Sequence, residues 1–182
     1  LMVDNNIYSV PSASSIAQFY IGCYYGSLSG HVNYKLHYDY LLKASTYHHC
    51  NALYSVFYIY YNGIIKFVNG VITNIVDKDL AKALEILEMI GDRECTYAQH
   101  KLGNIYGTCN EIVHSKDGVV FQHDVNKSIY WYRRLIDNDN VVTEQNKINI
   151  AYNIGVLYLT DDSYELRRDK EKALEYFYYP LL

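Results

Sequence analysis

The sequence predicts an all-α fold, an α-solenoid of about four helix-turn-helix repeats. The first observation is a pattern in which a small residue, an aliphatic residue and a tyrosine follow at four-residue intervals, with glycine after the aliphatic residue. This spacing places the three side chains on one face of a helix. The second observation is that the pattern recurs along the chain, each time followed by another amphipathic stretch. Recurring helix pairs are typical of solenoids.

The clearest first helix covers residues 97–106, where Ala98, Leu102 and Tyr106 share a face and Gly103 lies beside them. Glycine within a helix costs about 1 kcal/mol relative to alanine. We therefore expect another backbone to pass close to Gly103. Three further copies occupy the sets Ala17, Ile21, Gly22, Tyr25; Ala52, Val56, Phe57, Tyr60; and Ile150, Ile154, Gly155, Tyr158.

The second helix of each pair starts with a lysine and continues as an apolar stripe. In the stretch 124–136, Asp124 stands at the expected N-cap, and Trp131 and Tyr132 are expected in the core. An aspartate precedes the lysine by three residues in the last three copies. The aligned residues are Lys35, then Asp79 with Lys82, Asp124 with Lys127, and Asp169 with Lys172.

These motifs resemble the Sel-one-like repeat family, which is related to the tetratricopeptide repeats. Gly70-Val71 and Gly118-Val119 match the Gly-Val element of that family, whereas Phe57 and Ile150 depart from its pattern. The resemblance implies a right-handed superhelix in one domain covering residues 1–182. The expected repeats cover approximately residues 14–45, 46–91, 92–137 and 147–182.

Turn and capping residues mark where the expected helices begin and end along the chain. Ser14 or Ser15 can cap the first helix, which is expected to end before the glycines at 26 and 30. We expect the following helices at about residues 33–44, 46–62, 78–90, 97–106 and 124–136, followed by the fourth pair. The apolar end at 178–182 lacks a polar cap, so we expect it to contact more chain or a partner.

Two longer insertions, residues 64–76 and 107–123, separate the helices of the second and third pairs. In residues 64–76, Asn69-Gly70 between β-branched residues favours a short β-hairpin. A hairpin is also an alternative for residues 107–123. A plain loop that seats the next helix is the preferred interpretation, and the hairpin is the alternative.

Composition excludes several classes of protein. The chain has 182 residues and a net charge of −4 without a basic run, which disfavours nucleic acid. We expect no transmembrane segment, no signal peptide and a cytoplasmic location. Leu1 precedes Met2, however, so secretion stays open. Tyrosine is unusually frequent, with 22 residues; biased codon usage and a binding surface rich in rigid aromatic contacts are both open explanations.

No motif indicates catalysis, a metal or a cofactor. A nucleophile elbow and a phosphate-binding glycine loop are missing. The four cysteines, Cys23, Cys50, Cys95 and Cys109, form no zinc-ribbon spacing, and we expect four free thiols. His49 beside Cys50 is expected to be packed or solvated and not a metal ligand.

The resemblance implies that the first helices line a concave groove. The groove positions are Phe19, Asn51, Tyr54, Tyr58, Tyr97, His100, Asn104 and Tyr152. Since these are aromatic and nearly uncharged, they suit an apolar or tyrosine-stacking peptide. We therefore predict a non-enzymatic scaffold for a protein or peptide partner. The alternatives are a subunit docked permanently in an assembly, including self-association through the C-terminal end, and a β-lactam-binding or hydrolysing enzyme, an activity that the resemblance associates with cysteine-rich relatives.

Overall fold

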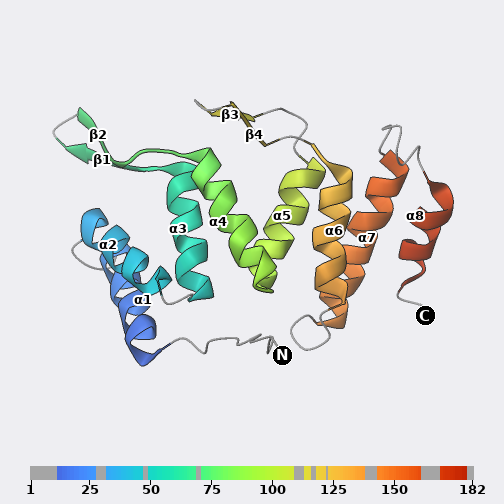
Figure 1. Ribbon diagram of the computed structural model, residues 1–182, viewed down its shortest axis with the longest axis horizontal. Coiled ribbons are helices and arrows are strands. Elements are labelled where there is room, and N and C mark those ends of the chain that lie inside the picture. The colour runs from blue at the N-terminus through green and yellow to red at the C-terminus, as the bar shows by residue number, and fades with distance from the viewer. Residues whose placement is uncertain are drawn as a thin grey trace, which may run out of the picture. The chain divides into compact units, whose positions relative to one another are not determined.

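The structure is a computed structural model that describes residues 12–27, 32–46, 49–68, 71–108, 113–115, 118–121, 123–137, 143–160 and 169–179. It consists of two compact units, Leu1–Arg93 and Glu94–Leu182, and each is described by itself. The first unit contains α1 (Ala13–Gly26), α2 (Tyr34–Ser45), α3 (Cys50–Asn62), β1 (Ile64–Val68), β2 (Val71–Val76) and α4 (Leu80–Asp92). The second contains α5 (Thr96–Thr108), β3 (Val113–Ser115), β4 (Gly118–Phe121), α6 (Val125–Ile136), α7 (Glu144–Thr160) and α8 (Lys170–Phe177). Figure 1 shows these helices, so the all-α repeat fold is confirmed.

The helices pack in consecutive antiparallel pairs. Within the first unit α1 packs on α2, α2 on α3 and α3 on α4. Within the second, α5 packs on α6, α6 on α7 and α7 on α8. Each unit therefore contains two helix pairs, and the second helix of one pair packs on the first helix of the next.

The second helices of the last three pairs begin in the same way. An aspartate N-cap accepts a hydrogen bond from the backbone N–H three residues ahead, at 2.9 to 3.0 Å. The ammonium group of that third residue, a lysine, lies 4.5 to 5.5 Å from the ring of the tyrosine that ends the first-helix motif. Both contacts stabilise the turn between the helices. The sets are Asp79, Lys82, Tyr60; Asp124, Lys127, Tyr106; and Asp169, Lys172, Tyr158.

The first pair uses asparagine at this cap. Asn33 accepts a hydrogen bond from the Leu36 N–H at 3.1 Å, and its own N–H donates to the Tyr25 carbonyl at 3.0 Å. Leu36 therefore occupies the lysine position, and the alignment of Lys35 with that position is wrong by one residue. The expected cap of α1 is also corrected, because Ser12 accepts from the Ser15 N–H at 3.1 Å.

The motif glycines Gly103 and Gly155 lie close to the second helix of their pair, but the expectation that another backbone passes close to Gly103 is wrong. A Cβ atom on Gly103 would lie 2.4 Å from Tyr132 Cε1, and one on Gly155 would lie 2.6 Å from a ring carbon of Phe177. The neighbour is thus an aromatic side chain of the second helix and not its backbone. In the second pair Phe57 replaces the glycine; its side chain is fully buried and packs against the ring of Tyr54, with a centroid distance of 5.6 Å.

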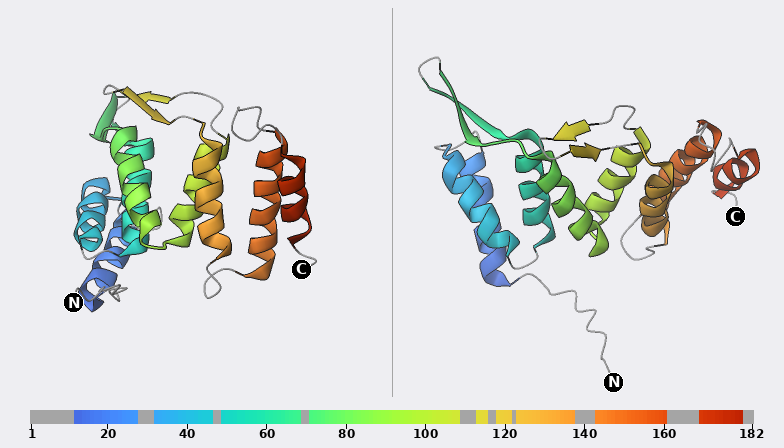
Figure 2. Two further views of the ribbon diagram at one scale, coloured as in Figure 1. Left: turned by 45° about the vertical axis from the view of Figure 1, so that its right-hand side comes forward. Right: turned by 45° about the horizontal axis from the view of Figure 1, so that its top comes forward.

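Both long insertions contain β-hairpins, so the preferred interpretation of plain loops is wrong. Strand β1 pairs with β2 in antiparallel register, with Ile64 opposite Val76, and β3 pairs with β4. Figure 2 shows that the β1–β2 hairpin projects beyond the ends of α3 and α4. Gly63, with φ of 75°, turns the chain from α3 into β1, a conformation that glycine adopts without strain.

The core of the second unit lies between α6, α7 and α8. Buried members include Ile129 and Leu135 of α6, Ile150 and Ile154 of α7, and Ala173 of α8. The expected core positions of Trp131 and Tyr132 are confirmed, since both are buried. The helix interfaces are thus filled by the apolar stripes that the sequence pattern predicts.

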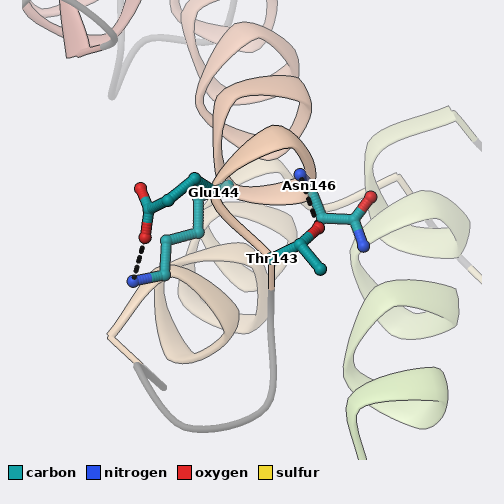
Figure 3. Close-up of polar contacts among 4 residues, drawn as sticks. Thr143, Glu144 and Asn146 are labelled. Atoms are coloured by element: carbon teal, nitrogen blue, oxygen red, sulfur yellow. Dashed lines mark hydrogen bonds and ion pairs between the residues drawn. The ribbon is translucent and has the colours of Figure 1, made fainter.

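The N-terminal end of α7 is held by local polar contacts (Figure 3). Thr143 Oγ1 accepts a hydrogen bond from the Asn146 N–H at 3.3 Å. Glu144 forms an ion pair at 3.3 Å with the buried side chain of Lys147. A carboxylate in the first turn also interacts favourably with the helix dipole.

Candidate functional site

Three of the predicted groove residues share one face of α3 in the first unit. Asn51 and Tyr58 are exposed there, and Tyr54 is half-buried between them. The hydroxyl oxygens of Tyr54 and Tyr58 lie 3.4 Å apart, and their rings meet edge to face with centroids 5.1 Å apart. Burial raises the pKa of the Tyr54 phenol, so its hydroxyl is neutral at neutral pH. This face offers hydroxyl and amide groups together with aromatic surface and carries no charge.

Phe19 lies apart from this face and contributes to the packing between α1 and α3. Its ring stacks on His49 with centroids 4.8 Å apart and an interplanar angle of 23°. His49 is itself buried and caps α3, because its Nδ1 accepts a hydrogen bond from the Ala52 N–H at 3.2 Å. Phe19 is therefore engaged in a contact between the first and second helix pairs.

The second unit places Tyr97 and His100 on the exposed side of α5. Asn104 is half-buried on the same side; its Nδ2 donates to His100 Nδ1 at 3.3 Å, and its Oδ1 accepts a hydrogen bond from the Tyr132 hydroxyl at 2.6 Å. Burial raises the pKa of Tyr132 to about 12. Asn104 thus links the exposed side of α5 to the core beneath it.

Tyr152 of α7 completes the predicted set in the second unit. Its ring is exposed, and it lies tilted against the ring of Phe177 of α8, with a centroid distance of 5.7 Å. It stands three residues before Gly155, as His100 stands before Gly103. The repeat pattern therefore gives α5 and α7 equivalent exposed positions. A single groove through both units stays a prediction.

Two exposed aromatic surfaces were missed by the sequence analysis. Tyr130 of α6 is exposed beside Arg134, whose guanidinium lies 5.8 Å from its ring centroid. On α1, Tyr20 and Tyr24 are exposed together with Ile21. The motif predicts burial of Ile21, because its counterparts are core residues, and no local sequence signal distinguishes α1 from the other first helices.

The bonding state of the cysteines differs from the expectation of four free thiols. Cys23 is free, but Cys50 and Cys95 are disulfide-bonded, and Cys109 lies outside the described residues. The expectation is therefore wrong for two of the four.

Over the described parts of the chain, no group of three or more histidine, cysteine or acidic side chains is arranged to hold a metal ion. None of the helices described is both long and apolar enough to cross a membrane.

A scan against protein-family models finds no match for the sequence, and a search of curated protein sequences finds none either. The structure is similar to the crystal structure of a Sel1 repeat protein from Oxalobacter formigenes, with a TM-score of 0.60 and 20% sequence identity. The match covers 92% of this chain and 57% of that one. The expected Sel-one-like repeat fold is thus confirmed, and the chain spans a little over half the length of the structure it matches.

Proposed function

We propose that this chain is a non-enzymatic interaction scaffold that binds a peptide or helix of a protein partner on its first helices. The observation that carries the proposal is that predicted groove positions on first helices of both units present exposed, uncharged tyrosine side chains. Tyr58, Tyr97 and Tyr152 are exposed at these positions. Tyrosine gives a large contact area at a low cost in conformational entropy, which suits a binding surface.

The chemistry of this surface favours one class of peptide. Asn51, Tyr54 and Tyr58 offer hydrogen-bonding groups beside aromatic rings on α3, and Tyr97 and His100 do so on α5. Burial lowers the pKa of His100, with a smaller contribution from the charge of Lys101, so its ring is neutral at neutral pH. A surface without charges does not favour a peptide with an acidic or a basic end. It fits an apolar or tyrosine-containing segment that also offers backbone hydrogen bonds.

The test uses peptides selected from a random phage-displayed library on the folded protein. The dissociation constant of a selected peptide is then measured for the wild type and for Tyr97→Ala and Tyr152→Ala. An aromatic binding anchor contributes about 2 kcal/mol or more, which corresponds to a loss of roughly thirtyfold in affinity. Because both rings are exposed, the melting temperature should change little, since surface substitutions usually shift stability by less than about 0.5 kcal/mol.

Tyr130→Ala is the matched control, because Tyr130 is also an exposed tyrosine but lies on a second helix. It should leave peptide affinity unchanged. Equal affinity for the wild type and both groove variants would contradict the proposal. So would a large drop in the melting temperature of Tyr97→Ala, which would identify the ring as part of the core.

A further inference from the structure

A network of hydrogen bonds crosses the second unit and ends at His100, on the exposed side of α5. Burial raises the pKa of Tyr132 to about 12, and a hydrogen bond that Asn153 of α7 donates to its hydroxyl oxygen acts in the opposite direction. The Tyr132 hydroxyl donates in turn to Asn104 Oδ1 at 2.6 Å. Asn104 Nδ2 lies 3.3 Å from His100 Nδ1. These four residues, the His100 network, connect α7 through α6 to α5.

The hydroxyl group of Tyr132 is not required for packing at its place in the repeat. Tyr132 follows its N-cap residue by eight positions, and the other three second helices carry an apolar residue there: Leu41, Leu87 and Phe177. Phe177 packs against the motif glycine of its own pair with a ring that carries no hydroxyl. A buried hydroxyl costs free energy unless it is hydrogen-bonded. The Tyr132 hydroxyl therefore serves the His100 network and not the helix interface.

The direction of these hydrogen bonds determines which nitrogen of His100 carries a hydrogen. Because Asn153 supplies a donor to the Tyr132 oxygen, the hydroxyl hydrogen is directed to Asn104 Oδ1. The Asn104 amide therefore faces His100 with Nδ2, a group that only donates, so His100 Nδ1 accepts. Burial and the charge of Lys101 lower the pKa of His100, so the ring is neutral at neutral pH. The single ring hydrogen then lies on Nε2.

We propose that the Nε2–H group of His100 is a fixed hydrogen-bond donor of the peptide-binding surface, which selects a partner peptide that places an oxygen acceptor there. This inference rests on the proposed function and specifies the chemistry of the partner. His100 is the specificity-determining residue, and Asn104 and Tyr132 are positioning residues. Tyr97 is exposed one helical turn before His100, so the acceptor lies beside an aromatic contact. A backbone carbonyl, a side-chain amide and a carboxylate each offer such an oxygen.

The first measurement locates the ring hydrogen in the free protein, without a peptide. Two-bond ¹H–¹⁵N correlation spectra of the histidine-labelled protein at about pH 8 distinguish the two neutral tautomers. The signals of His100 are identified as those missing from His100→Gln. The wild type should show the Nε2–H form. Tyr132→Phe, and Asn104→Val with the residue that α7 carries at the equivalent position 156, should each also admit the Nδ1–H form.

Tyr130→Phe is the matched control, because it removes an exposed hydroxyl from the same helix outside the His100 network. It should leave the tautomer of His100 unchanged. Circular dichroism melts check that each variant is folded, and the two network variants change different helices. A wild type with the hydrogen on Nδ1 would overturn the proposal, and so would spectra that neither network variant changes.

The second measurement compares the affinities of two His100 variants for a library-selected peptide that binds the wild type. His100→Phe keeps an aromatic ring without a donor and should weaken binding by about threefold to tenfold, the usual effect of one hydrogen bond. His100→Gln keeps an N–H donor at a similar distance from the backbone and should bind like the wild type. Equal affinities for His100→Phe and the wild type would contradict the inference.

Altered peptides then identify which oxygen contacts His100. One series replaces single backbone carbonyls with thioamides, whose sulfur is a weaker acceptor, and a second replaces each amide or carboxylate side chain with alanine. The change that weakens binding to the wild type but not to His100→Phe identifies the acceptor, because the two changes remove the same interaction. A peptide in which no position shows this coupling would overturn the proposal.

Failure of this inference is distinguishable from failure of the proposed function. A wild type that selects no peptide would refute the proposed function, and with it the role of His100 in binding, whatever the tautomer spectra show. Binding that Tyr97→Ala weakens and His100→Phe leaves unchanged would keep the proposed function and overturn this inference.

Discussion

Replacing Gly103 with alanine tests the contact that joins α5 to α6. The new Cβ atom would lie 2.4 Å from Tyr132 Cε1 and 2.6 Å from Cδ1, well inside van der Waals contact. The ring cannot move away freely, because Tyr132 is buried and its hydroxyl donates to Asn104 Oδ1 at 2.6 Å. Either the helices separate or this hydrogen bond is lost.

The expected magnitude follows from two opposing terms. Overpacking a core position costs about 1–3 kcal/mol, whereas alanine gains about 1 kcal/mol over glycine inside a helix. The net loss for Gly103→Ala is therefore about 0–2 kcal/mol. The 2.4 Å contact places it toward the upper end of that range, which lowers the melting temperature of a chain of this length by up to roughly 8 °C. Gly103→Leu adds further atoms at the same place and should cost several times more.

Gly22→Ala is the matched comparison within the same protein. Its Cβ atom would lie 3.2 Å from Leu41 Cδ2, at the end of a flexible side chain, and 3.3 Å from the Leu41 nitrogen. These contacts are longer than those at Gly103, although Leu41 is buried, so Gly22→Ala should lose less stability than Gly103→Ala. Thermal unfolding followed by circular dichroism measures both. Equal melting temperatures for Gly103→Ala and Gly22→Ala would refute the argument from close contact.

Three further predictions concern the caps and the cysteines. Burial lowers the pKa of His49 in the folded protein, so as the pH falls the unfolded chain takes up a proton at this residue before the folded protein does. The free energy of unfolding should therefore decrease as the pH drops below about 6.5. His49→Asn keeps a capping side chain and should flatten the dependence of melting temperature on pH between roughly pH 5 and 7. Asp124→Ala removes the cap from the Lys127 N–H and should cost about 1 kcal/mol in chemical unfolding, and a cost near zero would contradict the role of the cap. Because Cys50 and Cys95 are disulfide-bonded, thiol titration of the denatured, unreduced protein should count fewer than four thiols, and a count of four would show that both are reduced in solution.

Local patterns in the sequence determined the helices and their pairing. Ala98 and Leu102 recur at helical spacing and are buried, because a helix in a stack must cover the same stripe in each repeat. Asp124 was identifiable as a cap since capping depends on residues only three positions apart. Gly103 indicated close helix packing because glycine is otherwise costly inside a helix.

The tertiary structure decided which side chains are available on the surface. Phe19 and Tyr97 occupy first helices and both belong to the predicted groove, yet Phe19 stacks on His49 whereas Tyr97 is exposed. No local pattern separates them, because burial depends on which helix packs alongside. Ile21 shows the same principle in reverse: its motif predicts a core residue, but its side chain is 39% exposed. The hairpins also required the structure, since pairing of β1 with β2 depends on contacts across the turn that weak strand propensities do not determine.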